Sequence, residues 1–163
     1  MYYFLLIVFF LTGALISHVF HELMHYFVGR LVGLKFIRIQ WFTFHGGTKV
    51  CFEDEPDFNN ENVKVSWQWG ATSVAGIIGT SLLGYIMTIL FFFLPANYFR
   101  LFVWTFIANL LLNDTLYALL GSLNENGDTY CVRMFLGWSR MKILIASAIL
   151  LAVNFSVLFS TIR

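Results

Sequence analysis

The sequence predicts an all-α polytopic membrane protein with about four transmembrane helices and a small cytosolic β-hairpin after the first helix. Of its 163 residues, 59% are hydrophobic and 12% are charged, about half the charged share of an ordinary soluble domain. The apolar runs 2–28, 69–94, 99–120 and 143–162 can each cross a hydrocarbon core of about 30 Å as a helix. We therefore expect one membrane-embedded domain over residues 1–163.

The first apolar run is expected to remain in the mature protein as a permanent span. It lacks the basic start and the small-residue cleavage site of a secretory signal peptide. Its apolar character also continues past residue 20 without a break.

The basic residues predict how the chain is oriented in the cell membrane. With the N-terminus outside, only Arg100 and Arg163 of the ten Lys and Arg side chains fall outside. The other eight fall on the cytosolic side: Arg30, Lys35, Arg38, Lys49, Lys64, Arg133, Arg140 and Lys142. By the positive-inside rule both termini lie outside, and the loops 33–66 and 121–142 lie in the cytosol.

The first of these loops has the pattern of a β-hairpin. Residues 35–44 alternate in part and are rich in β-branched and aromatic side chains, His45-Gly46-Gly47 offers a turn, and residues 48–52 return. The hairpin is either a simple connector or a strand edge that pairs with an unwound peptide beside the first span.

Composition excludes several classes of protein. A net charge of +1 gives no indication of nucleic-acid binding, and two distant cysteines, Cys51 and Cys131, do not form a disulfide framework. Membrane desaturases and hydroxylases need several clusters of histidines, whereas this chain has four histidines.

The first span carries the pattern H-E-x-x-H as His21-Glu22-Leu23-Met24-His25. On a helix this spacing puts two imidazoles on one face, where they can hold a Zn²⁺ ion while Glu22 acts as general base. Ionisable side chains in lipid are costly, so their presence here indicates a function. His21 lies nine residues before Arg30, about 13 Å below the cytosolic boundary, and the site opens to the cytosol.

A catalytic zinc site usually has a third protein ligand, and the candidates are few. Asp128 is the first choice because it comes directly after a stretch rich in helix-breaking residues, 121–127, and can lead a helix over 129–136. A plain N-cap is the other interpretation of Asp128. Asp114, inside the third span, is either the ligand or a group that orients a histidine. His45 and Glu125 are expected at the surface, and His18 between helices or beside the site.

The H-E-x-x-H motif and the segments C-terminal to it resemble the site-2 protease family of intramembrane zinc metalloproteases. The resemblance covers about 15–136: the motif is succeeded by Gly33 and a β-rich segment, Ala75-Gly76 resembles the start of the family's middle helix, and 124–128 resembles the break that carries an Asp ligand. It implies a compact member without a PDZ domain, with Zn²⁺ on His21, His25 and Asp128 and with Glu22 as the catalytic base.

The activity implied is hydrolysis of peptide bonds in or near transmembrane segments of membrane proteins or hydrophobic leader peptides. The expected partners are the lipid bilayer and such a substrate. Assembly as a homo-oligomer or with an accessory membrane protein is compatible with this activity. The alternative is a catalytically inactive, metal-binding membrane subunit or scaffold.

Overall fold

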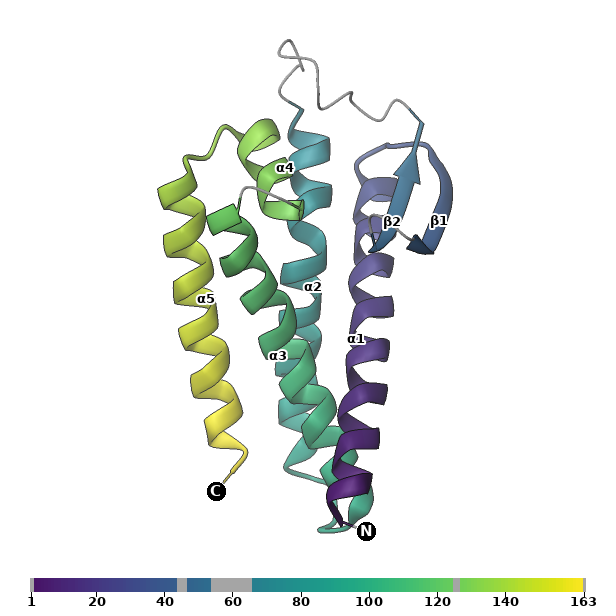
Figure 1. The fold of residues 1–163 in the computed structure, drawn as a ribbon, viewed down its shortest axis with the longest axis vertical. Helices are drawn as coiled ribbons and strands as arrows, with labels where there is room; N and C mark the ends of the chain where they lie inside the picture. Colours follow the sequence, from purple (N-terminus) through teal and green to yellow (C-terminus); the bar gives the residue numbers. More distant parts are fainter. Residues whose placement is uncertain (1, 44–46, 54–65, 125–126, 163) are drawn as a thin grey trace.

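A computed structural model describes residues 2–43, 47–53, 66–124 and 127–162 of the chain (Figure 1). Within them the chain is all-α apart from one two-stranded antiparallel sheet after the first helix, which confirms the predicted fold class. The elements are α1 (Tyr2–Leu31), β1 (Phe36–Thr43), β2 (Gly47–Phe52), α2 (Trp67–Phe91), α3 (Tyr98–Asn124), α4 (Gly127–Leu136) and α5 (Arg140–Ser160).

Four of the helices, α1, α2, α3 and α5, are long and apolar enough to cross a membrane, so the chain is a multi-pass membrane protein. Both termini lie at one end of this bundle, and the sheet and α4 lie at the other (Figure 1). The two long connections therefore share one end of the molecule, as the sequence predicted.

The helices differ from the predicted apolar runs mainly at their ends. The third helix was expected to end near residue 120 because Gly121 and Asn124 weaken helices, but α3 runs to Asn124. The guanidinium of Arg140, at the start of α5, donates hydrogen bonds to the carbonyls of Ser122 and Leu123. These contacts satisfy carbonyls that the last turn of a helix leaves without partners, which stabilises the extra turn.

The apolar core lies in the half of the bundle that contains the termini. Phe91 of α2, Val103, Ile107 and Leu111 of α3, and Leu158 of α5 form one buried cluster there. Such packing leaves the other half of the bundle, which carries the polar residues of α1, free to form a cavity.

The β-hairpin folds back along α1 instead of extending away from it. Phe52 pairs with Phe36 at the open end of the sheet, and its ring packs on Gly29 where a side chain would leave it no room. Nearer the turn, the hydroxyl of Thr48 is hydrogen-bonded at 2.9 Å to Nε2 of His18. Strand β2 therefore lies beside the motif helix. Of the predicted turn, Gly47 begins β2, and His45 and Gly46 fall outside the described residues.

Candidate metal centre

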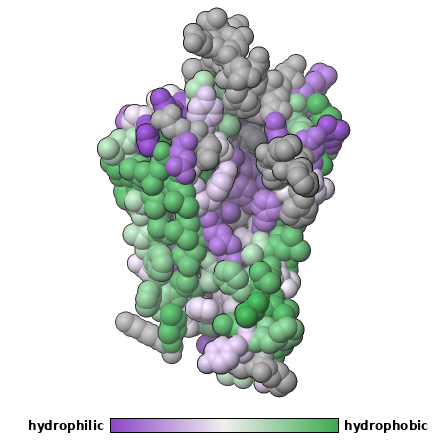
Figure 2. Space-filling view, in the orientation of Figure 1, coloured by the Kyte–Doolittle hydropathy of each residue, from purple (hydrophilic) through white to green (hydrophobic). Residues whose placement is uncertain are grey.

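An open cavity of about 840 Å³ lies between α1 and β2 on one side and α3 and α4 on the other. Figure 2 shows it as a hydrophilic hollow between two strongly hydrophobic flanks. The side chains of His21, Glu22, His25, Asp114 and Asp128 all line this cavity. A polar hollow in an apolar bundle brings water to a depth where lipid would otherwise exclude it.

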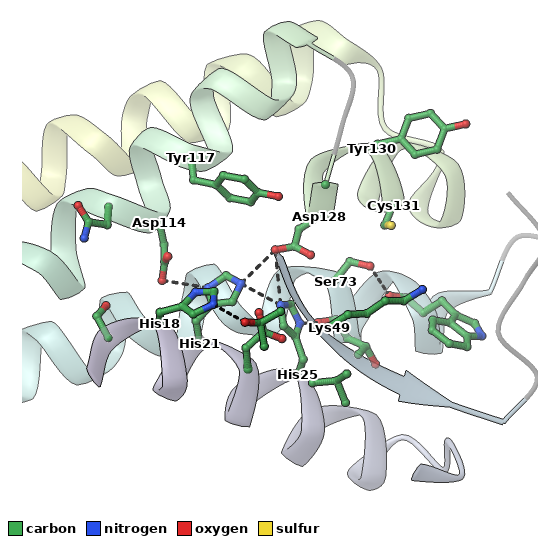
Figure 3. A pocket seen from close by; sticks show the side chains of 18 of the residues that line it. His18, His21, His25, Lys49, Ser73, Asp114, Tyr117, Asp128, Tyr130 and Cys131 are labelled. Atoms are coloured by element: carbon green, nitrogen blue, oxygen red, sulfur yellow. Dashed lines mark hydrogen bonds and ion pairs between the residues drawn. The ribbon is translucent and has the colours of Figure 1, made fainter. Parts of the chain in front are cut away.

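Three side chains from two helices direct ligand atoms at one point (Figure 3). The Nε2 atoms of His21 and His25 are 2.9 Å apart. Oδ2 of Asp128 lies 3.1 Å from Nε2 of His21 and 3.5 Å from Nε2 of His25. The structure thus brings together the three residues that the sequence analysis proposed as metal ligands.

The other ring nitrogen of each histidine faces an acceptor. Nδ1 of His25 donates a 2.6 Å hydrogen bond to the carbonyl of Thr72 on α2. Nδ1 of His21 lies 3.0 Å from Oδ2 of Asp114 on α3. That pair does not meet hydrogen-bond geometry, and neither buried atom has another hydrogen-bond partner among the described residues. The carboxylate nevertheless favours a proton on Nδ1 of a neutral His21 ring.

These contacts make the cluster electron-rich at its centre. A neutral imidazole with its proton on Nδ1 presents a lone pair at Nε2. When both rings are in this form, two lone pairs and a carboxylate oxygen face one another at the centre of the cluster. Three acceptors at this spacing repel one another unless a proton or a metal cation lies between them.

The spacing fits a metal ion of the size of zinc. With bonds of about 2.0 to 2.1 Å in a tetrahedron, neighbouring ligand atoms of a zinc site are about 3.3 Å apart. The three separations in the cluster, 2.9, 3.1 and 3.5 Å, lie around this value. Three protein ligands are also the number that catalytic zinc sites use, with the fourth position left to water.

The geometry separates the roles of the two aspartates. Asp114 contacts Nδ1 of His21, whereas the cluster of possible ligand atoms lies at Nε2, the other nitrogen of the same ring. Its carboxylate is therefore placed to orient the ring, an arrangement common around protein metal sites, and not to complete the ligand set. Asp128 has the position that a third ligand needs.

Helix α4 begins at the point where Asp128 is required. Asp128 lies in the first turn of α4, as predicted, and the preceding Gly127 has a φ of 62°. The hydroxyl of Tyr117 on α3 occupies the space where a side chain of Gly127 would lie, and it is hydrogen-bonded to the backbone of Asp128. Sequence reasoning missed this role of Tyr117, because a tyrosine in an apolar helix gives no such signal.

The charge of Asp128 suits a metal ligand. Burial alone would raise the pKa of its carboxyl. When the rings of His21 and His25 are protonated, the charge of His25 and the hydrogen bonds from both rings outweigh burial and lower that pKa. Asp128 therefore stays ionised at neutral pH.

Gly76 of α2 supports the site by leaving space. A Cβ at this position would overlap the imidazole ring of His21, so the ring can pack directly on the α2 backbone. Gly84, two turns further along, instead makes room for Leu111 of α3. The small residues of α2 thus serve the site at one position and ordinary helix packing at another.

The remaining predicted residues lie around the cluster or outside the described part of the chain. Glu22 is only 5% exposed and lines the cavity beside the cluster. His18 lines the cavity and is hydrogen-bonded to Thr48 of the hairpin, because β2 folds back to its level. His45 and Glu125 lie outside the described residues.

Comparisons with protein-family models, with curated proteins and with solved structures found no match for this chain.

Proposed function

We propose that the protein is an intramembrane zinc metalloendopeptidase of the site-2 protease type. The observation that carries this proposal is the meeting of the His21 and His25 lone pairs with the Asp128 carboxylate, beside Glu22, inside a membrane bundle. The site has the metal-ligand set, the acid–base group and the open cavity that hydrolysis needs. The substrate is a membrane protein or hydrophobic peptide with a span that enters the bundle from the bilayer.

The residues of the chain divide the chemistry between them. A zinc ion held by His21, His25 and Asp128 would polarise the scissile carbonyl and activate a water. The carboxylate of Glu22 accepts a proton from the attacking water as the C–O bond forms. It then delivers this proton to the leaving nitrogen as the C–N bond breaks. Asp114 and the carbonyl of Thr72 keep both imidazoles oriented with Nε2 toward the site.

In the proposed orientation, water for the reaction reaches the site from the cytosol. With both termini outside the cell membrane, the end that carries the hairpin and α4 faces the cytosol, and the cavity opens toward it. The substrate must unwind locally, because a helix holds its carbonyls in backbone hydrogen bonds. Strand β2, which lines the cavity, offers a surface for the unwound segment.

The test compares wild type with Glu22→Gln, and with Glu53→Gln as the matched control. Glu53 is a surface residue paired with Lys35 at 2.9 Å. Each protein is reconstituted in vesicles with a labelled single-span peptide, and bound zinc is measured by mass spectrometry. We expect about one zinc per chain in all three, and a loss of cleavage of roughly 10²- to 10⁴-fold in Glu22→Gln only.

Two other outcomes would change the conclusion. If zinc binds but wild type and Glu22→Gln behave alike on every membrane peptide tried, the chain is a catalytically inactive metal-binding subunit. If zinc does not bind, the metalloprotease proposal itself fails.

A further inference from the structure

The cavity extends below the metal cluster, toward the middle of the bundle. Along α1 its lining reaches from His25 down to Ser17 and Ala14. Just below, α1 and α3 come together at Gly13, where a Cβ would lie 3.2 Å from the Cα of Phe106. The residues of α1 that line the cavity end at Ala14, so this close approach of the two helices bounds the cavity at its inner end.

Ser17 at this inner end is a buried hydroxyl without a hydrogen-bond partner among the described residues. It is 1% exposed, and its Oγ makes no hydrogen bond to them. Other buried hydroxyls of this bundle behave differently: Thr80, Thr88 and Thr115 each donate to the carbonyl four residues earlier. A buried polar group without a partner is rare and needs a physical explanation.

Asn113 faces the same end of the cavity from α3. The amide nitrogen of Asn109 donates to the carbonyls of Phe10 and Thr105, which fixes its oxygen as an acceptor. That oxygen accepts a 2.6 Å hydrogen bond from the amide nitrogen of Asn113. Asn113 is therefore held with its own Oδ1 available, and this exposed side chain lines the cavity.

The two residues together offer a donor and an acceptor to one small ligand group. The hydroxyl of Ser17 can donate, and the amide oxygen of Asn113 can accept. A carboxamide, which carries one C=O and one NH₂, satisfies both. Because α1 and α3 approach closely at Gly13, just beyond this end of the cavity, we expect the group to be a short side chain.

We propose that Ser17 and Asn113 form a subsite that binds an asparagine side chain of the substrate on the membrane-interior side of the scissile bond. The inference rests on the proposed proteolytic function. Ser17 lies one helical turn before His21, about 6 Å deeper along α1. An extended chain rises about 3.3 Å per residue, so the preferred residue lies about two positions from the scissile bond.

Two single-span peptides test the subsite, one with Asn and one with Leu at this interior position. Binding is measured by fluorescence anisotropy on Glu22→Gln protein in nanodiscs, and cleavage on protein with Glu22 intact. We expect the Asn peptide to be preferred about five- to tenfold in both measurements. Ser17→Ala should remove most of this preference, and Ser17→Thr, which keeps the hydroxyl, should restore it.

Ser156→Ala is the matched control. Ser156 is exposed on α5 and donates to the carbonyl of Ala152, so its loss should leave the preference unchanged. The inference is overturned if wild type shows no preference, or if Ser17→Ala weakens both peptides equally, which would assign the hydroxyl to water or to packing. Either result leaves cleavage by wild type intact, whereas failure of the proposed function would abolish cleavage of both peptides.

Discussion

At the scale of single residues, the histidine protons decide what the cluster can do. The carbonyl of Thr72 can only accept, so it requires the proton of His25 on Nδ1. Asp114 favours the same tautomer in His21. With the Nδ1 proton fixed in this way, each ring already directs its Nε2 atom at the cluster, which lowers the cost of assembling the site.

Asp114→Asn should weaken zinc binding without abolishing it. An amide keeps the size of the carboxyl but loses the charge that holds the Nδ1 proton of His21. Partners of this kind are typically worth roughly 10- to 100-fold in metal affinity. Titration against a competing chelator would measure the change.

Asp128→Asn is the comparison for this prediction. It removes an anionic ligand and should cost more affinity than Asp114→Asn. The opposite ranking would make Asp114 the third ligand and would contradict the geometry of the cluster.

The sequence predicted part of this site and could not predict the rest. His21, Glu22 and His25 belong to one helical motif, because a spacing of four residues fixes a shared face. The helix-breaking residues before Asp128 made it the first choice over Asp114, but no local pattern could assign the two roles. Their roles depend on which side of the His21 ring each helix approaches, which is a tertiary property.

At the scale of elements, the start of α4 determines where Asp128 points. Gly127 and Gly137, on either side of α4, have φ values of 62° and 65°, a region that side chains disfavour. A Cβ on Gly137 would meet open space, whereas a Cβ on Gly127 would collide with the hydroxyl of Tyr117. A side chain at either glycine would therefore strain the backbone, but only a side chain at Gly127 would also disturb the site.

Alanine at each glycine separates these effects. Gly127→Ala and Gly137→Ala should each lower stability by about 1 to 2 kcal/mol through backbone strain, measured by thermal unfolding in detergent. Only Gly127→Ala should also weaken zinc binding, by roughly tenfold or more, because it displaces the ligand Asp128. Equal zinc affinities in the two variants would show that α4 does not position the ligand.

The elements were easier to predict than their ends. Long apolar runs and a strand–turn–strand pattern predicted four spans and a hairpin, and both are present. The extra turn of α3 was missed because it depends on the side chain of Arg140, sixteen residues after Asn124. The return of β2 to the level of His18 was missed for the same reason, since the contact is not local.

At the scale of the whole molecule, the bundle has a polar, hollow half and an apolar, packed half. The cavity lies toward the end that carries the hairpin and α4, and the apolar cluster lies toward the end that carries the termini (Figure 2). This division lets water reach one end of the bundle while the other end remains sealed. The side of the membrane that supplies the water therefore depends on the orientation of the chain.

Cysteine labelling would test that orientation in a background with Cys51→Ser and Cys131→Ser. Ala96→Cys places a thiol in the exposed turn between α2 and α3, and Met141→Cys places one near the start of α5, where the native side chain is 62% exposed. A membrane-impermeant maleimide should label Ala96→Cys in intact cells and Met141→Cys only in inverted vesicles. The reason is the eight-to-two division of basic residues, since cytosolic loops retain Lys and Arg.

The reverse labelling pattern would place the cavity mouth outside the cell. Eight basic side chains would then lie on the outer side, against the positive-inside rule, and water for hydrolysis would enter from outside. The metal cluster itself would be unaffected, because its geometry depends on the packing of α1, α2, α3 and α4 and not on the direction of insertion. Labelling at both positions in intact cells would instead indicate a mixed orientation, in which only one population could present its site to cytosolic water.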